Sequence, residues 1–145
     1  MTQEHWTERY LGIPYKVKGR DETGVDCWGL IYLIYIEMFG VELPLYTERY
    51  VDLRDPQGIH NIAEKVEEES ITFGCTRVLR GQELFGDVIL LPLEGMYTHV
   101  AMCIEGNLMI HALEGTEVTI EDYTTGKWLS RYQRAQIYRH PGVCT

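Results

Sequence analysis

The sequence predicts an α+β domain in which N-terminal helices pack on a small antiparallel sheet. The chain has 145 residues, a length that suits one core, so residues 1–145 are expected to form a single domain. Residues 26–39 are apolar over a length typical of a buried helix, whereas residues 98–113 have the alternation of paired strands. Because the helical patterns precede the strand patterns, the order is that of an α+β fold.

The first half of the chain contains the expected helices. The helix at Asp26–Phe39 has a favourable N-cap in Asp26, and Gly40 stands where a helix commonly ends. In chain order, the other segments are a short helix at Gln3–Tyr10, a loop at Gly12–Val25, irregular chain at Val41–Pro56 and a polar, amphipathic helix at Gln57–Ser70.

The second half contains the expected strands. They are predicted at Asp87–Leu91, Thr98–Ile104, Leu108–Leu113, Val118–Ile120 and Ala135–Arg139. We interpret Gly86-Asp87 as a turn that leads into the first of these strands, and Trp128 as a structural residue.

Composition narrows the range of partners. The net charge is −9 and the pI is about 5.0, so the chain offers no basic stripe for nucleic acid. The apolar run at 28–36 is too short to span a bilayer, and no membrane partner is expected. The first residues lack the basic and apolar regions of a secretory signal. We therefore expect the chain to be cytoplasmic when it is synthesised.

Cys27 is the first candidate for chemistry. A thiol in the first turn of a helix meets unpaired backbone N–H groups and the positive end of the helix dipole, which favour its thiolate. This placement predicts a low-pKa nucleophile that alkylating agents modify before the other three cysteines. The alternative is an ordinary buried cysteine that follows an N-cap, since free cysteine is among the most buried residue types.

The cysteines give no sign of a metal site. The chain has four of them and no Cys-x-x-Cys pair, so they are expected to be free thiols in a reducing compartment. His99 and Cys103 are four residues apart, as are His140 and Cys144, and this spacing makes a poor chelate on a strand. No metal and no cofactor are expected, and activity should survive EDTA.

The turn of the predicted hairpin decides whether His99 and His111 can cooperate. Side chains alternate across a strand, so a two-residue turn would put the two histidines on opposite faces. A three-residue loop at Glu105-Gly106-Asn107 instead pairs Ile104 with Leu108 and makes the histidines diagonal neighbours on one face. The sequence therefore predicts an odd-length loop.

The apolar pattern supports the same register. One face is then wholly apolar and consists of Val100, Met102, Ile104, Leu108, Ile110 and Ala112. The other face consists of His99, Ala101, Cys103, Met109, His111 and Leu113. A lone histidine is most simply a half-buried, satisfied residue. Two on one face, in a chain with a candidate nucleophile, favour catalysis.

These residues suggest thiol-dependent acyl transfer. A cysteine nucleophile needs a base, and the base needs a residue that orients it. We assign Cys27 as the nucleophile, His99 as the base and His111 as the orienting residue. The backbone N–H of Cys27 at the helix start is a candidate for part of an oxyanion hole.

An ordered set of motifs resembles the NlpC-type cysteine peptidases, which are papain-like enzymes that cut the peptide stems of bacterial peptidoglycan. The resemblance extends from about Leu11 to Tyr138. Its motifs are Gly12-Ile13-Pro14-Tyr15, Asp26-Cys27-Trp28-Gly29-Leu30, Gly86-Asp87-Val88-Ile89, Thr98-His99-Val100-Ala101 and Met109-Ile110-His111-Ala112. It implies a papain-like fold and peptidoglycan peptides as substrate.

The resemblance also implies roles for individual residues. The family nucleophile falls on Cys27, its base on His99 and its third polar residue on His111. Tyr15 is expected to line the site. Asp26 and Trp28, on either side of the nucleophile, are expected with Tyr15 to bind substrate.

Two departures indicate a branch of the family. Trp28 stands where the family usually has serine, and Lys18-Gly19 stands where it usually has two glycines. Trp28 resembles the tail-associated members of bacteriophages and prophages, which implies other tail proteins as partners and a place in the virion tail. The alternatives are a tail-assembly structural protein that retains the triad, and another thiol-dependent amidase or acyltransferase.

Overall fold

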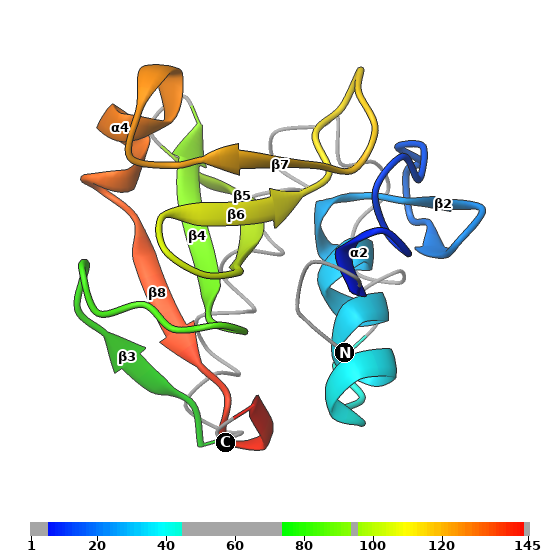
Figure 1. Ribbon diagram of the computed structural model, residues 1–145, viewed down its shortest axis with the longest axis horizontal. Helices are drawn as coiled ribbons and strands as arrows, with labels where there is room; N and C mark the ends of the chain where they lie inside the picture. The colour runs from blue at the N-terminus through cyan, green and yellow to red at the C-terminus, as the bar shows by residue number, and fades with distance from the viewer. Residues whose placement is uncertain (1–5, 45–73, 94–95, 144–145) are drawn as a thin grey trace.

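The structure is a computed structural model that describes residues 6–44, 74–93 and 96–143. It is an α+β fold, as predicted, with one six-stranded antiparallel sheet and a small two-stranded sheet. Figure 1 shows the helix α2 (Cys27–Ile34) beside the larger sheet. The expected helix at Gln57–Ser70 lies outside the described residues.

The segment before α2 is more ordered than the predicted loop. Trp6 and Thr7 are helical and turns follow to Gly12. Strands β1 (Arg20–Asp21) and β2 (Gly24–Val25) then form an antiparallel hairpin. The prediction of a loop over Gly12–Val25 is wrong here, because the side chain of Asp21 accepts from the backbone N–H of Thr23 at 2.9 Å and closes a tight turn.

The helix that begins at Cys27 starts and ends as predicted. The Asp26 side chain accepts a hydrogen bond from the backbone N–H of Gly29 at 2.7 Å, which is the N-cap contact. After Ile34 the helix continues as the π-helical turn η1 (Tyr35–Phe39). It stops at Gly40, whose φ of +66° is a conformation that glycine adopts at little cost. The π-helical turn has no signature in the sequence pattern.

The six-stranded sheet has the order β3-β8-β4-β5-β6-β7. Its strands are β3 (Thr76–Val78), β4 (Val88–Leu93), β5 (Met96–Cys103), β6 (Leu108–His111), β7 (Thr119–Asp122) and β8 (Gln136–Arg139). Five of them correspond to predicted strands, and β3 was not predicted. The helix α4 (Gly126–Tyr132) and the short 3₁₀ turn η2 (Pro141–Val143) were not predicted either.

The β5–β6 hairpin has the predicted register. Met102 pairs with Ile110 and Cys103 with Met109, and the N–H of Ile104 donates to the carbonyl of Leu108 at 2.9 Å. The loop therefore holds three residues, and its Gly106 has a φ of +60°. The prediction of an odd-length loop is confirmed.

Each face of the sheet is covered by apolar residues. The predicted apolar face packs against α2, although Leu108 at its end is exposed. The histidine face packs under α4 and shares its cluster with Ala101, Cys103 and Met109. Among the described residues, no helix has the length and apolar character needed to cross a membrane.

Candidate active site

Cys27 is the first residue of α2 and is 5% exposed. The backbone N–H groups of Val100 and Trp28 donate toward its sulfur. Val100 directly follows His99 on β5, so the thiol lies against the strand that carries the predicted base. Within residues 6–44, 74–93 and 96–143, no hydrogen bond joins the thiol to an imidazole.

The thiol of Cys27 is protonated in this arrangement. Burial, and then the carboxylate of Asp26, raise the pKa of Cys27 to about 12. The N–H groups of Val100 and Trp28 and the guanidinium of Arg20 act in the opposite direction but are outweighed. The expectation of a low-pKa thiol is therefore wrong for the resting structure. The helix start does contribute N–H groups, but the same N-cap brings a buried carboxylate next to the sulfur.

Alkylation rates test this correction. We expect iodoacetamide at pH 7.5 to modify the partly exposed Cys75 faster than the buried Cys27, because reaction needs both access and thiolate. Peptide mass spectrometry at timed quenches measures both rates in one sample. A faster reaction at Cys27 would mean that its thiolate is already formed in the resting protein.

The two histidines lie together inside the sheet, on the face predicted for them. His99 is 2% exposed and His111 fully buried, and their rings join through a hydrogen bond of 2.8 Å between His99 Nε2 and His111 Nδ1. On its other side, His111 Nε2 lies 2.7 Å from Oε2 of Glu121. The site thus contains a chain of two imidazoles and a carboxylate.

Both rings are neutral at neutral pH. Burial, aided by His111 and Arg131, holds the pKa of His99 well below its usual value of 6.5. Burial also lowers the pKa of His111, while the hydrogen bond and charge of Glu121 act against it and Lys127 adds to the lowering. His99 is therefore in the form that accepts a proton.

This burial has a consequence for stability. The unfolded chain binds protons at its histidines near pH 6.5, whereas the folded chain does not, so stability must fall as the pH drops below 6.5. The slope for each histidine is at most about 1.4 kcal/mol per pH unit. Urea denaturation at pH 7.5 and 5.5 measures it, with His99→Gln/His111→Gln as the variant that should lose most of the slope. Equal slopes in both proteins would contradict burial of neutral rings.

Trp128 of α4 covers the histidine pair. Its ring stacks on His99 with centroids 5.6 Å apart and planes at 23°, and meets His111 edge to face at 5.1 Å. The side chain is 2% exposed, so it shields the bond between the histidines from water. The interpretation of Trp128 as structural missed this contact, since it depends on the unpredicted helix α4.

Asp26 anchors the start of α2. Besides capping Gly29, its buried carboxylate accepts from Arg20 Nη1 at 2.7 Å and from the backbone N–H of Lys18 at 2.8 Å. These contacts tie the β1–β2 hairpin to α2. In the structure this carboxylate has no exposed surface and positions its neighbours, and a substrate contact at Asp26 stays a prediction.

Close backbone packing explains two glycines near Cys27. A Cβ atom at Gly29 would lie 1.9 Å from the carbonyl oxygen of Gly19, and one at Gly19 would lie 2.2 Å from that of Gly24. Lys18 has a φ of +61°, a conformation that usually favours glycine. This chain therefore has a left-handed backbone at the position where the resembled family usually has glycine.

The other two predicted substrate-binding residues differ in exposure. Trp28 is 3% exposed and its indole Nε1 donates to the carbonyl of Pro44 at 2.7 Å, and its predicted contact with substrate stays a prediction. Tyr15 is half-buried, bridges to Val25 and packs against the core. A substrate contact at Tyr15 stays a prediction.

Glu121 is the residue of this cluster that sequence reasoning missed. It pairs with Met109, which has the same parity as His111, so it falls on the histidine face. Only the register of β7 against β6 indicates that Glu121 lies on this face, and a single sequence does not determine that register. Among the described residues, no three histidine, cysteine or acidic side chains are placed to hold a metal ion.

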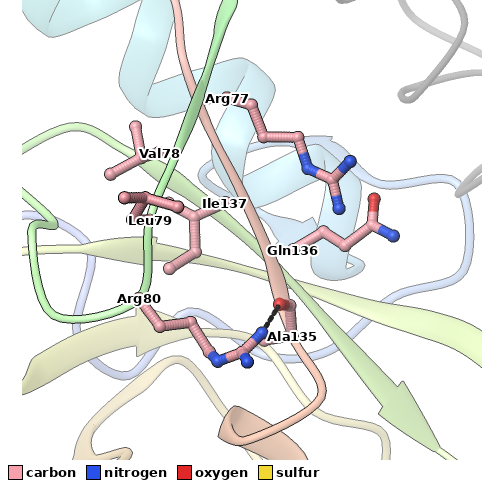
Figure 2. Close-up of a pocket in the computed structure, with 7 residues that line it drawn as sticks. All are labelled: Arg77, Val78, Leu79, Arg80, Ala135, Gln136 and Ile137. Atoms are coloured by element: carbon pink, nitrogen blue, oxygen red, sulfur yellow. Dashed lines mark hydrogen bonds between the residues drawn. The ribbon is translucent and has the colours of Figure 1, made fainter.

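A pocket of about 600 Å³ lies away from these residues and is lined by side chains of β3, of β8 and of the segments next to them. Figure 2 shows Arg77 and Arg80 along it, with Arg80 Nη1 donating to the carbonyl of Ala135 at 3.2 Å. Neither Cys27 nor the histidines line it. The pocket is therefore separate from the candidate active site.

Comparisons with known proteins agree with the motifs. The family model of NlpC/P60 matches residues 12–137. "Murein DD-endopeptidase MepS/Murein LD-carboxypeptidase" of Escherichia coli strain K12 is 24% identical over 127 residues, which are 88% of this chain. That stretch is 56% of the relative, so the chain spans about half the length of the curated relatives it matches.

Solved structures agree in fold. The NlpC/p60 domain of the peptidoglycan hydrolase SagA superposes with a TM-score of 0.61 at 22% identity, over 94% of this chain and 93% of that one. RipD of Mycobacterium tuberculosis, described as a non-catalytic NlpC/p60 domain protein adapted to peptidoglycan binding, gives 0.50 at 20% identity, over 86% and 89%. These likenesses confirm the papain-like α+β fold. With the family model matching most of its length, this chain belongs to the NlpC/P60 family.

Proposed function

We propose that this protein is a cysteine peptidase that hydrolyses amide bonds in peptidoglycan stem peptides. The observation that carries the proposal is the buried hydrogen bond between His99 of β5 and His111 of β6, together with the contact of the Cys27 thiol with the N–H of Val100 on β5. The name of the E. coli relative, which includes an endopeptidase activity on murein, supports the substrate class.

The geometry suggests the order of the steps. Since Nε2 of His99 is bonded to His111, Nδ1 is the nitrogen left to take the proton of Cys27. The resting pair is a neutral thiol and a neutral imidazole, so the proton moves as the sulfur attacks the substrate carbonyl. Catalytic hydrogen bonds often form only in the substrate complex, which fits the lack of a thiol–imidazole bond at rest among the described residues.

The remaining steps follow from the acyl-enzyme. The C–N bond breaks as His99 returns the proton to the leaving amine, and a thioester with Cys27 remains. His99 then takes a proton from water, whose oxygen attacks the thioester and releases the acid and the thiol. At the start of α2 the N–H of Gly29 donates to Asp26 and that of Trp28 donates toward the Cys27 sulfur. The backbone N–H of Cys27 itself is therefore our candidate donor to the oxyanion.

Product analysis tests the proposal. Purified peptidoglycan is incubated with the wild-type protein, with Cys27→Ala or with Cys103→Ala, which removes a second buried thiol outside the site. We expect new peptide amine termini, detected by mass spectrometry of the released muropeptides, with wild type and Cys103→Ala only. Binding without cleavage by all three would favour the non-catalytic role described for RipD.

We further propose that the protein is a tail component of a bacteriophage or prophage, made in the host cytoplasm and acting in cell-wall penetration or tail assembly. The support is the sequence alone, namely Trp28 after the nucleophile. Complementation of a phage that lacks this gene, with wild type or Cys27→Ala, tests it. Tails that assemble and infect with the inactive variant would favour the structural alternative, and tails that are normal without the gene would contradict the proposal.

A further inference from the structure

The hydrogen-bond chain of the site does not end at His111 but continues to Glu121 on β7. We propose that Glu121 is a positioning residue that sets the tautomer of both histidines and so leaves Nδ1 of His99 as the base. Its effect on catalysis rests on the proposed function, whereas its effect on the tautomers does not.

Strand register places Glu121 for this role. In the β6–β7 ladder, Met109 pairs with Glu121 and His111 with Thr119. Glu121 is therefore the diagonal neighbour of His111 on the same face, and its Oε2 reaches His111 Nε2 at 2.7 Å. The carboxylate side chain is 35% exposed while the imidazole is fully buried. The carboxylate thus connects the buried pair to the surface.

The bond between the two rings leaves its own direction open. A neutral imidazole has one N–H and one acceptor nitrogen, so either ring of the pair is able to donate. If His111 Nδ1 donated, His99 would carry its own proton on Nδ1 and would have no acceptor for the thiol of Cys27. If His99 Nε2 donates, His99 Nδ1 is free to accept a proton.

Glu121 selects between these two arrangements. A carboxylate only accepts, so the proton of His111 must sit on Nε2, facing Oε2 of Glu121. His111 Nδ1 is then the acceptor, and His99 Nε2 must donate to it. This step assigns the protonation of all four ring nitrogens, and His99 Nδ1 is left unprotonated.

The charge of Glu121 is a second way in which this residue acts on the histidine pair when His99 takes a proton. Lys127 and Arg131 of α4 lie over Trp128 and disfavour a cation on the histidines, Lys127 acting on His111 and Arg131 on His99. Glu121 on β7 is the acidic side chain that faces His111 and favours its charged form. Glu121 therefore has two separable effects, the choice of tautomer and the stabilisation of positive charge.

Histidine NMR tests the choice of tautomer without any substrate. Protein labelled with ¹⁵N at histidine is compared at pH 7.5 as wild type, Glu121→Ala, Glu121→Gln and Glu114→Ala, an exposed glutamate in the β6–β7 connection. We expect His99 and His111 to carry their protons on Nε2 in wild type and Glu114→Ala, and to shift toward the other tautomer in Glu121→Ala. A wild-type His111 protonated on Nδ1, or tautomers unchanged in Glu121→Ala, would overturn the proposal.

Kinetics on a purified stem peptide test the consequence. We expect Glu121→Ala to lower kcat by about 10- to 100-fold with little change in KM, as for other residues that orient a functional side chain. Glu121→Gln keeps an acceptor oxygen and should recover part of the loss, but without the charge its acid limb of kcat/KM should move to lower pH. If Glu121→Ala had the same kcat as the wild type, the positioning role would be refuted. An inactive wild type would refute the proposed function and leave the NMR result to decide the tautomers.

Discussion

Replacing Cys27 by alanine is expected to abolish hydrolysis of peptidoglycan peptides. The sulfur forms the covalent intermediate in the proposed reaction, and no other thiol of the described residues lies at the start of α2. The measurement is kcat/KM on a purified stem peptide, where the variant should fall below detection. An acyl-enzyme trapped by rapid acid quench should be seen in wild type only.

The matched control for this prediction is Cys103→Ala. Cys103 is buried like Cys27, but it lies in the cluster under α4 and contacts the hydroxyl of Tyr123 at 3.7 Å. Both variants remove one buried sulfur, so a fall in thermal stability should be similar in the two. If Cys27→Ala still turned over substrate while folded, a covalent mechanism through Cys27 would be excluded.

Replacing His99 by alanine should lower kcat/KM nearly as much as replacing Cys27. In the proposed reaction His99 takes the proton of the thiol and returns it to the leaving amine, and help of this kind is worth roughly 10²–10⁴-fold. Because the two residues act as one unit, the double variant with Cys27→Ala should be little worse than either single one. The same stem peptide and the same kcat/KM measurement apply.

Substitutions of His111 should lower kcat/KM less than Cys27→Ala or His99→Ala. His111 Nδ1 holds His99 at 2.8 Å, and a side-chain amide provides an acceptor oxygen in its place. His111→Asn and His111→Gln should therefore keep measurable activity, whereas His111→Ala should lose more. If His111→Ala were as inactive as Cys27→Ala while His99→Ala remained active, the base and the orienting residue would be reversed.

The features predicted correctly from sequence depend on short stretches of chain. The Asp26 N-cap needs only the next three residues, and the parity of His99 and His111 needs only the length of one loop. Local chemistry decides both, so a single sequence contains the information. The same holds for Gly40, where the helix ends in a left-handed residue.

The features that were missed depend on contacts across the fold. The pKa of Cys27 follows from coverage by β5 and from the buried carboxylate of Asp26, and burial is known only when the chain has folded. Glu121 reaches His111 through the register of β7, and Trp128 through the placement of α4. Short strands such as β3, with mostly exposed side chains, carry too little apolar pattern to be found.

The protonated, covered thiol of Cys27 has a consequence for how the protein withstands oxidants. Peroxides attack thiolates, and susceptibility follows thiolate character and exposure. A nucleophile that is 5% exposed and has its pKa raised to about 12 is a poor target at neutral pH. The sulfur should therefore stay reduced during long storage in air.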